Sequence, residues 1–151
     1  MIRFLALTLV LLAVGTAGLS VYVRQVRVDP ADWNVAVVTA DPATPGPCTD
    51  KIKLVPQGAR ATCLVPGTPA EVLAKLDAIA LATPRTKRIA GTDNLVTWES
   101  RSQVMGFPDY ITAEVVVGPD GTRLDIFGRQ RFGGGDMRVN AARLKAWLSQ
   151  L

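Results

Sequence analysis

The chain has 151 residues, with 17 lysines and arginines, 13 aspartates and glutamates, and no histidine. The lack of histidine excludes Ser-His-Asp and Cys-His catalysis and removes the commonest zinc ligand. The formal net charge is +4. Without Arg3 and Arg24, the chain has 15 basic and 13 acidic residues, so the remaining net charge is +2 and is dispersed along the sequence. This excludes the clustered positive charge that a nucleic-acid-binding protein needs.

The N-terminus carries an uncharged, apolar run of 20 residues, from Phe4 to Val23, between Arg3 and Arg24. A helix of that length spans about 30 Å, the thickness of the hydrocarbon core of a bilayer. We therefore expect residues 1–27 to be a transmembrane anchor with its flanks. A cleaved signal peptide is the alternative, with Gly15-Thr16-Ala17 as a small-x-small cleavage site, but such peptides have a shorter apolar region of roughly 7–15 residues.

The orientation of this anchor depends on the two cysteines, because the flanking charges show no clear positive-inside asymmetry. Cys48 and Cys63 form an even pair in a Pro-rich region, which suits a disulfide in an oxidising compartment. We therefore expect the rest of the chain on the exported side of the membrane. Two unpaired thiols remain the alternative, since nothing in the sequence shows that the two side chains meet.

Residues 28–68 are expected to form a Pro-rich, extended connection, because seven of the ten prolines lie between residues 29 and 69. Within it, two apolar stretches around Pro56-Gln57-Gly58 predict a hairpin. Thr68, Pro69 and Glu71 then form a capping box that predicts a helix, which continues with apolar residues at helical spacing and ends at Thr83-Pro84.

The remaining sequence predicts three or four strands and a last helix. The strands are expected at residues 85–90, 95–104, 110–117 and 123–131, with a turn at Gly118-Pro119-Asp120-Gly121. Their apolar and polar residues alternate, which indicates an antiparallel sheet covered on one side. The last helix is expected from about Met137. The predicted fold of residues 69–151 is α+β, a small antiparallel sheet of three to five strands with two helices on one face.

The best local candidate for a site is the stretch from Arg129 to Asp136, in which a strand end runs through three glycines into a helix. Backbone N–H groups at a helix N-terminus, flanked by arginines, can bind an anion. Asp136 provides the alternative, because as a helix cap it would occupy the same N–H groups. A carboxylate pair of Glu99 and Glu114 is less expected than cross-strand ion pairs on the same sheet face.

The candidate binding residues are therefore all polar or charged and lie late in the chain: Arg101, Asp109, Arg129, Arg131, Asp136 and Asn140. No catalytic residue, metal ligand or cofactor is expected.

A spaced set of motifs resembles the bacterial domain of unknown function 1499 family. The set consists of Ser100-Arg101, Gly106-Phe107-Pro108-Asp109-Tyr110, Arg131-Phe132-Gly133, Asp136, Val139-Asn140 and Arg143. The resemblance covers residues 69–151, and the Leu-rich start with Asp29-Pro30-Ala31-Asp32-Trp33 is similar to membrane-anchored proteobacterial members. The chain departs from the family at Gly128-Arg129-Gln130, Gly134-Gly135 and Ala141-Ala142. The family implies the fold and no established activity.

From these features we expect a single-pass protein of the inner membrane with a non-catalytic binding or structural domain in the periplasm. Its expected partners are the membrane and either another envelope protein or an anionic headgroup, and not nucleic acid. The alternative is a histidine-free hydrolase or transferase that uses arginine and carboxylate groups. A deep pocket gathering Arg101, Arg131, Asp109 and Asp136 would favour the enzyme, and a flat, ion-paired face the binding domain.

Overall fold

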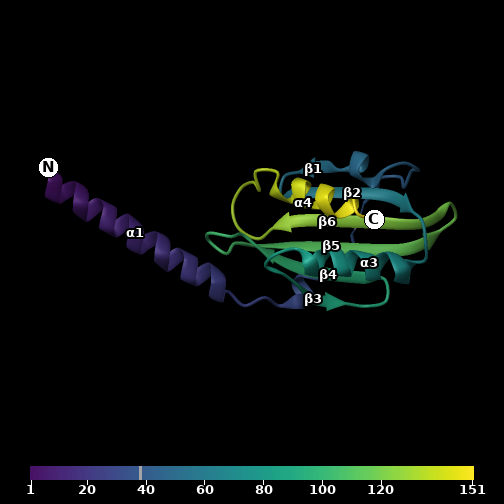
Figure 1. The fold of residues 1–151 in the computed structure, drawn as a ribbon, viewed down its shortest axis with the longest axis horizontal. Coiled ribbons are helices and arrows are strands. Elements are labelled where there is room, and N and C mark those ends of the chain that lie inside the picture. Colours follow the sequence, from purple (N-terminus) through teal and green to yellow (C-terminus); the bar gives the residue numbers. More distant parts are fainter. Residues whose placement is uncertain (38) are drawn as a thin grey trace.

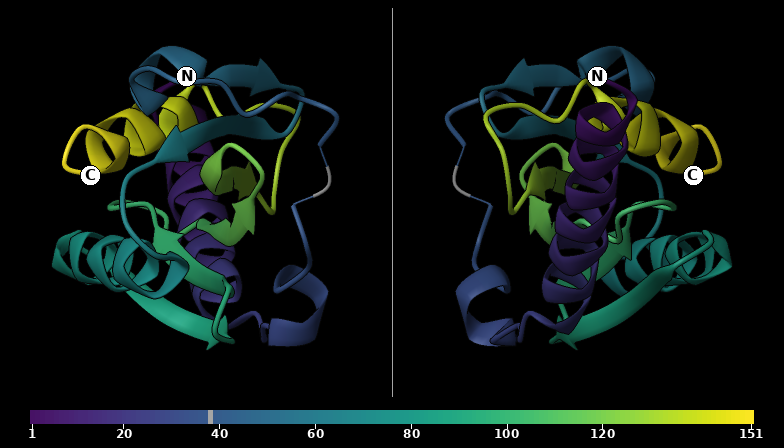
Figure 2. Two further views of the ribbon diagram at one scale, coloured as in Figure 1. Left: turned by 90° about the vertical axis from the view of Figure 1, so that its right-hand side faces the viewer. Right: turned by 90° about the vertical axis from the view of Figure 1, so that its left-hand side faces the viewer.

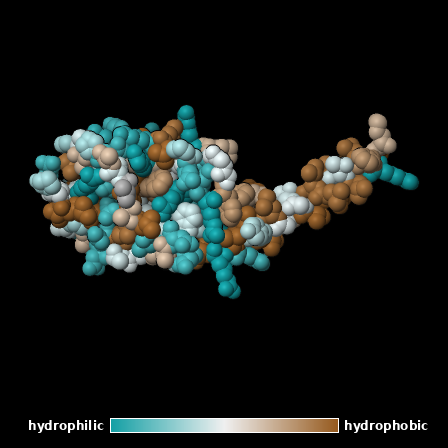
Figure 3. Space-filling view, turned by 180° about the vertical axis from the view of Figure 1, so that it is seen from behind, coloured by the Kyte–Doolittle hydropathy of each residue, from teal (hydrophilic) through white to brown (hydrophobic). Residues whose placement is uncertain are grey.

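A computed structural model describes residues 1–37 and 39–151. Its first element is helix α1 (Ile2–Gln25), which projects away from the rest of the chain (Figure 1). The helix is long and apolar enough to cross a membrane, and its apolar surface is exposed along its length, whereas the domain surface is mostly hydrophilic (Figure 3). The N-terminal apolar helix predicted from the sequence is therefore present.

The domain is built on one six-stranded antiparallel sheet with the order β1-β2-β6-β5-β4-β3. The strands are β1 (Lys53–Val55), β2 (Gly58–Val65), β3 (Thr86–Gly91), β4 (Leu95–Arg101), β5 (Pro108–Gly118) and β6 (Gly121–Gln130). The α+β class is confirmed, with one more strand than the upper limit that we expected. The predicted hairpin within residues 28–68 forms strands β1 and β2, and β2 pairs with β6. The sheet therefore begins before residue 69, the expected start of the α+β domain.

Two helices cover one face of the sheet, as predicted, and the main core lies between them and the strands (Figure 2). Helix α3 (Pro69–Ala82) begins with the expected capping box of Thr68 and Glu71. Helix α4 (Val139–Leu148) contributes Trp147, whose ring packs edge-on against Trp98 of β4. A short 3₁₀ helix, η1 (Cys48–Lys51), joins this layer through a disulfide between Cys48 and Cys63, whose Cα atoms are 5.5 Å apart.

The opposite face of the sheet was expected to face water, and this part of the prediction was wrong. The segment that follows α1, including helix α2 (Pro30–Trp33), lies across that face (Figure 2). Trp33 stacks on the buried Tyr110 ring with 3.8 Å between centroids, and Thr112 donates a hydrogen bond to the Trp33 carbonyl. Polar side chains are tolerated in this layer because they hydrogen-bond to the covering segment and to one another.

Candidate functional site

Three of the candidate arginines hold the end of α1 and the segment that follows it onto the sheet. Arg101 donates to the carbonyl of Val23, Arg131 to that of Arg27, and Arg129 to that of Trp33. Each is a charge-assisted hydrogen bond to a neutral carbonyl, of the kind that contributes about 1.5–3 kcal/mol. These guanidinium groups therefore connect the end of α1 and the segment after it to the domain.

Arg101 makes the most contacts of the three. Its Nε and Nη2 donate to the two carboxylate oxygens of Glu99 at 2.6 and 3.2 Å, and its Nη1 donates to Val23 and Gly106 at 3.1 Å each. The Glu99 side chain is only 1% exposed. The bidentate pair compensates the desolvated carboxylate, and the two carbonyl contacts add the end of α1 and the β4–β5 loop to the same cluster.

Arg129 lies between aromatic rings. Its guanidinium carbon is 5.1 Å from the ring centroid of Trp33 and 5.3 Å from that of Phe127. Burial lowers the pKa of Arg129. Cation–π contacts are stronger in such a desolvated place, so this residue also serves to fix Trp33 over the sheet.

The three remaining candidates lie on the other face, at the start of α4. Asp109 receives a hydrogen bond of 3.0 Å from Arg143, and the same nitrogen of Arg143 donates to Asn140. Burial raises the pKa of Asp109, Arg143 opposes this effect, and the nearby charge of Asp136 adds to it. Asn140 is fully buried, and within residues 1–37 and 39–151 its Nδ2 has no hydrogen-bond partner.

The six candidates therefore do not form one site. The sheet separates Arg101, Arg129 and Arg131 from the group of Asp109, Asp136 and Asn140. A pocket of about 290 Å³ contains Asp109 and Asp136 but neither Arg101 nor Arg131. Glu99 and Glu114 are also apart, because β4–β5 register places Glu99 opposite Tyr110 and Glu114 opposite Leu95. Among the described residues, no group of three cysteine or carboxylate side chains is placed to hold a metal.

The N-cap of α4 is Arg138, so the N-cap position expected for Asp136 was wrong, but the Asp136 side chain still accepts from N–H groups at the start of this helix. The carboxylate accepts from the backbone nitrogens of Arg138 and Asn140 at 3.0 and 2.9 Å. Helix α4 begins at Val139, two residues later than expected, because Met137 and Arg138 adopt left-handed backbone conformations with φ of 49° and 65°.

Replacement of Asp136 by alanine is expected to lower the free energy of unfolding by about 1 kcal/mol, because it removes a helix-capping acceptor. Thermal unfolding of the full-length protein in detergent, with and without 50 mM phosphate as probe, measures this loss. Phosphate should not restore the stability of Asp136→Ala. Restoration by phosphate would mean that the glycine-rich turn is itself an anion site.

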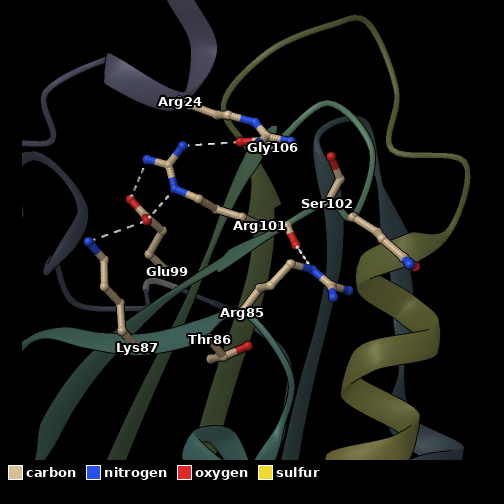
Figure 4. Close-up of a pocket in the computed structure, with 9 residues that line it drawn as sticks. Arg24, Arg85, Thr86, Lys87, Glu99, Arg101, Ser102 and Gly106 are labelled. Atoms are coloured by element: carbon tan, nitrogen blue, oxygen red, sulfur yellow. Dashed lines mark hydrogen bonds and ion pairs between the residues drawn. The ribbon is translucent and has the colours of Figure 1, made fainter. Parts of the chain in front are cut away.

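A second pocket, of about 400 Å³, opens at the end of the sheet that adjoins α1 (Figure 4). It lies between the last turn of α1, the start of β3, the end of β4 and the β4–β5 loop. The lining residues are Arg24, Arg85, Thr86, Lys87, Glu99, Arg101, Ser102, Gln103 and Gly106. Four cationic side chains thus share the pocket with one carboxylate.

We call this pocket the basic pocket, and its cationic side chains differ in the partners that they already have within the chain. Arg101 satisfies Glu99, and Lys87 lies 3.5 Å from the same carboxylate with 65% of its side chain exposed. Arg24 and Arg85 each donate to a backbone carbonyl, of Val104 and Arg101 respectively, and neither forms an ion pair with the parts of the chain that the structure describes. Arg24, Arg85 and Lys87 therefore line the same pocket and keep N–H donors free, although the side chains of Arg85 and Lys87 point to opposite sides of β4 (Figure 4).

Sequence reasoning identified only Arg101 in this pocket. Arg24 was interpreted as a flank of the membrane helix, and Arg85 and Lys87 as parts of a weak strand. Arg85 and Lys87 follow Arg24 by at least 61 positions in the chain. The three residues line one pocket only because β3 pairs with β4 beside the end of α1. The predicted strand 85–90 would place Arg85 and Lys87 on one side, but β3 begins at Thr86 and Arg85 has a left-handed φ of 59°, so strand alternation does not determine where its side chain points.

Comparison with known proteins agrees with the motifs. No curated protein matches this sequence. The pattern of the family described as "Protein of unknown function (DUF1499)" matches residues 37–151, which include every strand of the sheet and helices α3 and α4. Because the match covers more than half of the chain and the whole α+β domain, the chain belongs to the DUF1499 family.

Proposed function

We propose that this chain is a single-pass inner-membrane protein, anchored by residues 1–27, whose non-catalytic periplasmic domain binds an anionic group in the basic pocket. The observation that carries the proposal is the charge of this pocket. Arg24, Arg85 and Lys87 all line the pocket, while the single carboxylate, Glu99, is already compensated by Arg101. Charged donors of this kind recognise phosphate or carboxylate oxygens.

Two features support the anchored, periplasmic arrangement. The disulfide of Cys48 and Cys63 favours an oxidising compartment, because such bonds are rare where thiols are kept reduced. Val23, at the end of the apolar run, is buried against the domain, and its carbonyl accepts from Arg101. The end of α1 is thus part of the folded unit, as expected for an anchor that remains attached.

The pocket is better suited to binding than to catalysis. General acid–base catalysis needs a group that can exchange a proton at the bound substrate. Glu99 is the one carboxylate of the pocket, and it is buried under a bidentate arginine. Asp109 and Asp136, the other acidic candidates, line a different pocket on the helix-covered face.

Binding of a soluble phosphate ester tests this proposal. Full-length protein in nanodiscs of phosphatidylcholine is titrated with sn-glycerol 3-phosphate by isothermal calorimetry. We expect saturable binding that Arg85→Gln/Lys87→Gln weakens at least about tenfold, because each charged hydrogen bond contributes about 1.5–3 kcal/mol and 1.4 kcal/mol is a factor of ten.

The control variant removes the same number of charges elsewhere. Arg88→Gln/Lys145→Gln changes an exposed residue on the neighbouring position of β3 and another on α4, neither of which lines the basic pocket. It should bind like the wild type. Equal weakening in both double variants would show a general charge effect and contradict the proposed site, as would the absence of saturable binding to the wild type.

A further inference from the structure

The β4–β5 loop, residues 102–107, contacts α1 inside its apolar run. The hydroxyl of Ser20 donates to the Met105 carbonyl at 3.2 Å, and Arg24 Nη2 donates to the Val104 carbonyl at 2.8 Å. The stem of Arg24 also covers Gly106, where an added Cβ would lie 2.7 Å from the Arg24 Cγ. The loop is therefore held beside the last turn and a half of the membrane helix.

This contact determines the depth of the loop in a bilayer spanned by α1. Arg24 is the first charged residue after the apolar run, and Ser20 precedes it by four residues, or about 6 Å along the helix. The headgroup layer on each side of the hydrocarbon core is about 5–8 Å thick. With the apolar run filling the hydrocarbon core, Arg24 lies at the edge of the core and Ser20 about 6 Å inside it, so a loop hydrogen-bonded to both lies at the boundary between hydrocarbon and headgroups.

The side chains at this end of the domain suit such a position. Val104, at the tip of the loop, is 79% exposed, and Met137, in the β6–α4 loop, is 92% exposed. Phe107 and Phe132 connect the two loops, with ring centroids 6.1 Å apart. Figure 1 shows both loops projecting from the end of the sheet that faces α1. Exposed apolar tips beside basic residues are typical of surfaces that lie in a membrane interface.

The basic pocket opens at the same level. Arg24 lines the pocket and contacts the loop, so the pocket that Arg24, Arg85 and Lys87 line (Figure 4) lies at the depth of lipid phosphates. Positive charge near an anionic leaflet is attracted by about 1 kcal/mol per lysine or arginine. The positive charge of the pocket, the depth of the loop and the exposed apolar residues thus all favour an anionic lipid as the ligand.

We propose that the tips around Val104 and Met137 insert into the leaflet from which α1 emerges, and that the basic pocket binds the headgroup phosphate of an anionic phospholipid of that leaflet. This inference rests on the proposed function, since it identifies the anion as a lipid and its source as the same membrane. A soluble phosphate ester shares the chemistry of the headgroup, and a protein partner on the apolar tips is the competing occupant.

Insertion is tested with a fluorescent label on full-length protein in nanodiscs of phosphatidylglycerol and phosphatidylcholine that contain a headgroup spin-labelled lipid. The label is placed on Val104→Cys, or on Val117→Cys as matched control, without reductant so that the native disulfide stays intact. Val117 is also apolar and 76% exposed, but lies at the far end of β5. We expect at least fivefold stronger quenching at position 104. Equal quenching at both positions would overturn the insertion.

Headgroup binding is tested by native mass spectrometry of the full-length protein released from mixed nanodiscs. The wild type should retain phosphatidylglycerol at least fivefold over phosphatidylcholine. This preference should disappear in Arg85→Gln/Lys87→Gln and persist in Arg88→Gln/Lys145→Gln. No preference in the wild type would overturn the lipid assignment. If glycerol 3-phosphate still binds in that case, the anion site stands and only the lipid inference fails; if it does not bind either, both fail.

Discussion

Replacing Arg101 with methionine is expected to lower the free energy of unfolding of the domain by about 3–5 kcal/mol, the cost of removing one partner of a buried ion pair. The variant leaves the Glu99 carboxylate, 1% exposed, with only Lys87 at 3.5 Å. It also removes the donor to the carbonyls of Val23 and Gly106. Tryptophan fluorescence during denaturant unfolding of the full-length protein in detergent measures the loss.

Two further variants separate the buried pair from a loss of surface charge. Arg88→Met removes a partly exposed arginine that lies 3.8 Å from Asp77, and should change stability by no more than about 1 kcal/mol. Arg101→Met/Glu99→Leu removes both charges and should be more stable than Arg101→Met alone, since the unpaired carboxylate is gone. A double variant as unstable as the single one would show that the carbonyl contacts, not the ion pair, dominate.

Removing the disulfide is expected to lower stability by about 3 kcal/mol, the loop-closure contribution for 15 residues in the chain-entropy model. Cys48→Ala/Cys63→Ala is the appropriate variant, because both positions are buried against apolar neighbours and serine would add unpaired hydroxyls. Denaturant unfolding under non-reducing conditions compares it with the wild type.

The same bond reports on the compartment of the domain. Maleimide added to denatured protein from cells, without reductant, should label neither cysteine, and labelling should appear only after reduction. Labelling of both cysteines before reduction would mean that the pair is reduced in the cell, and would contradict the periplasmic orientation.

The arginines of the sheet suggest how the domain is positioned at a membrane. Arg101 binds the carbonyl of Val23 in the last turn of α1, and Arg131 and Arg129 bind those of Arg27 and Trp33 in the segment that follows. These three contacts restrain the connection between α1 and the sheet, so the domain has a defined position and orientation relative to the end of α1. The proposed insertion of the β4–β5 loop depends on this restraint.

Local patterns determined much of the fold. The capping box at Thr68 and Glu71 satisfies helix N–H groups within four residues, so it predicted the start of α3 without knowledge of the rest of the chain. The alternation in residues 95–104 and 110–117 identified β4 and β5 and their helix-facing side chains, although β4 ends at Arg101, since a strand presents alternate residues to opposite faces. The length and apolarity of α1 were also evident from the sequence alone.

Tertiary structure decided what the polar residues do. An arginine has the same sequence signature whether it binds a ligand, a buried carboxylate or a backbone carbonyl, and the choice depends on which distant segment reaches its five donors. Arg101, a candidate binding residue, binds Glu99 and the end of α1 and lines the basic pocket together with Arg24 and Lys87, which no motif marked. The apolar helix and the strand and helix periodicities depend on neighbouring residues and were therefore evident from the sequence. The covering of the second sheet face by the segment after α1, and the set of cations that line the basic pocket, depend on contacts between residues as many as 104 positions apart, which no local pattern contains.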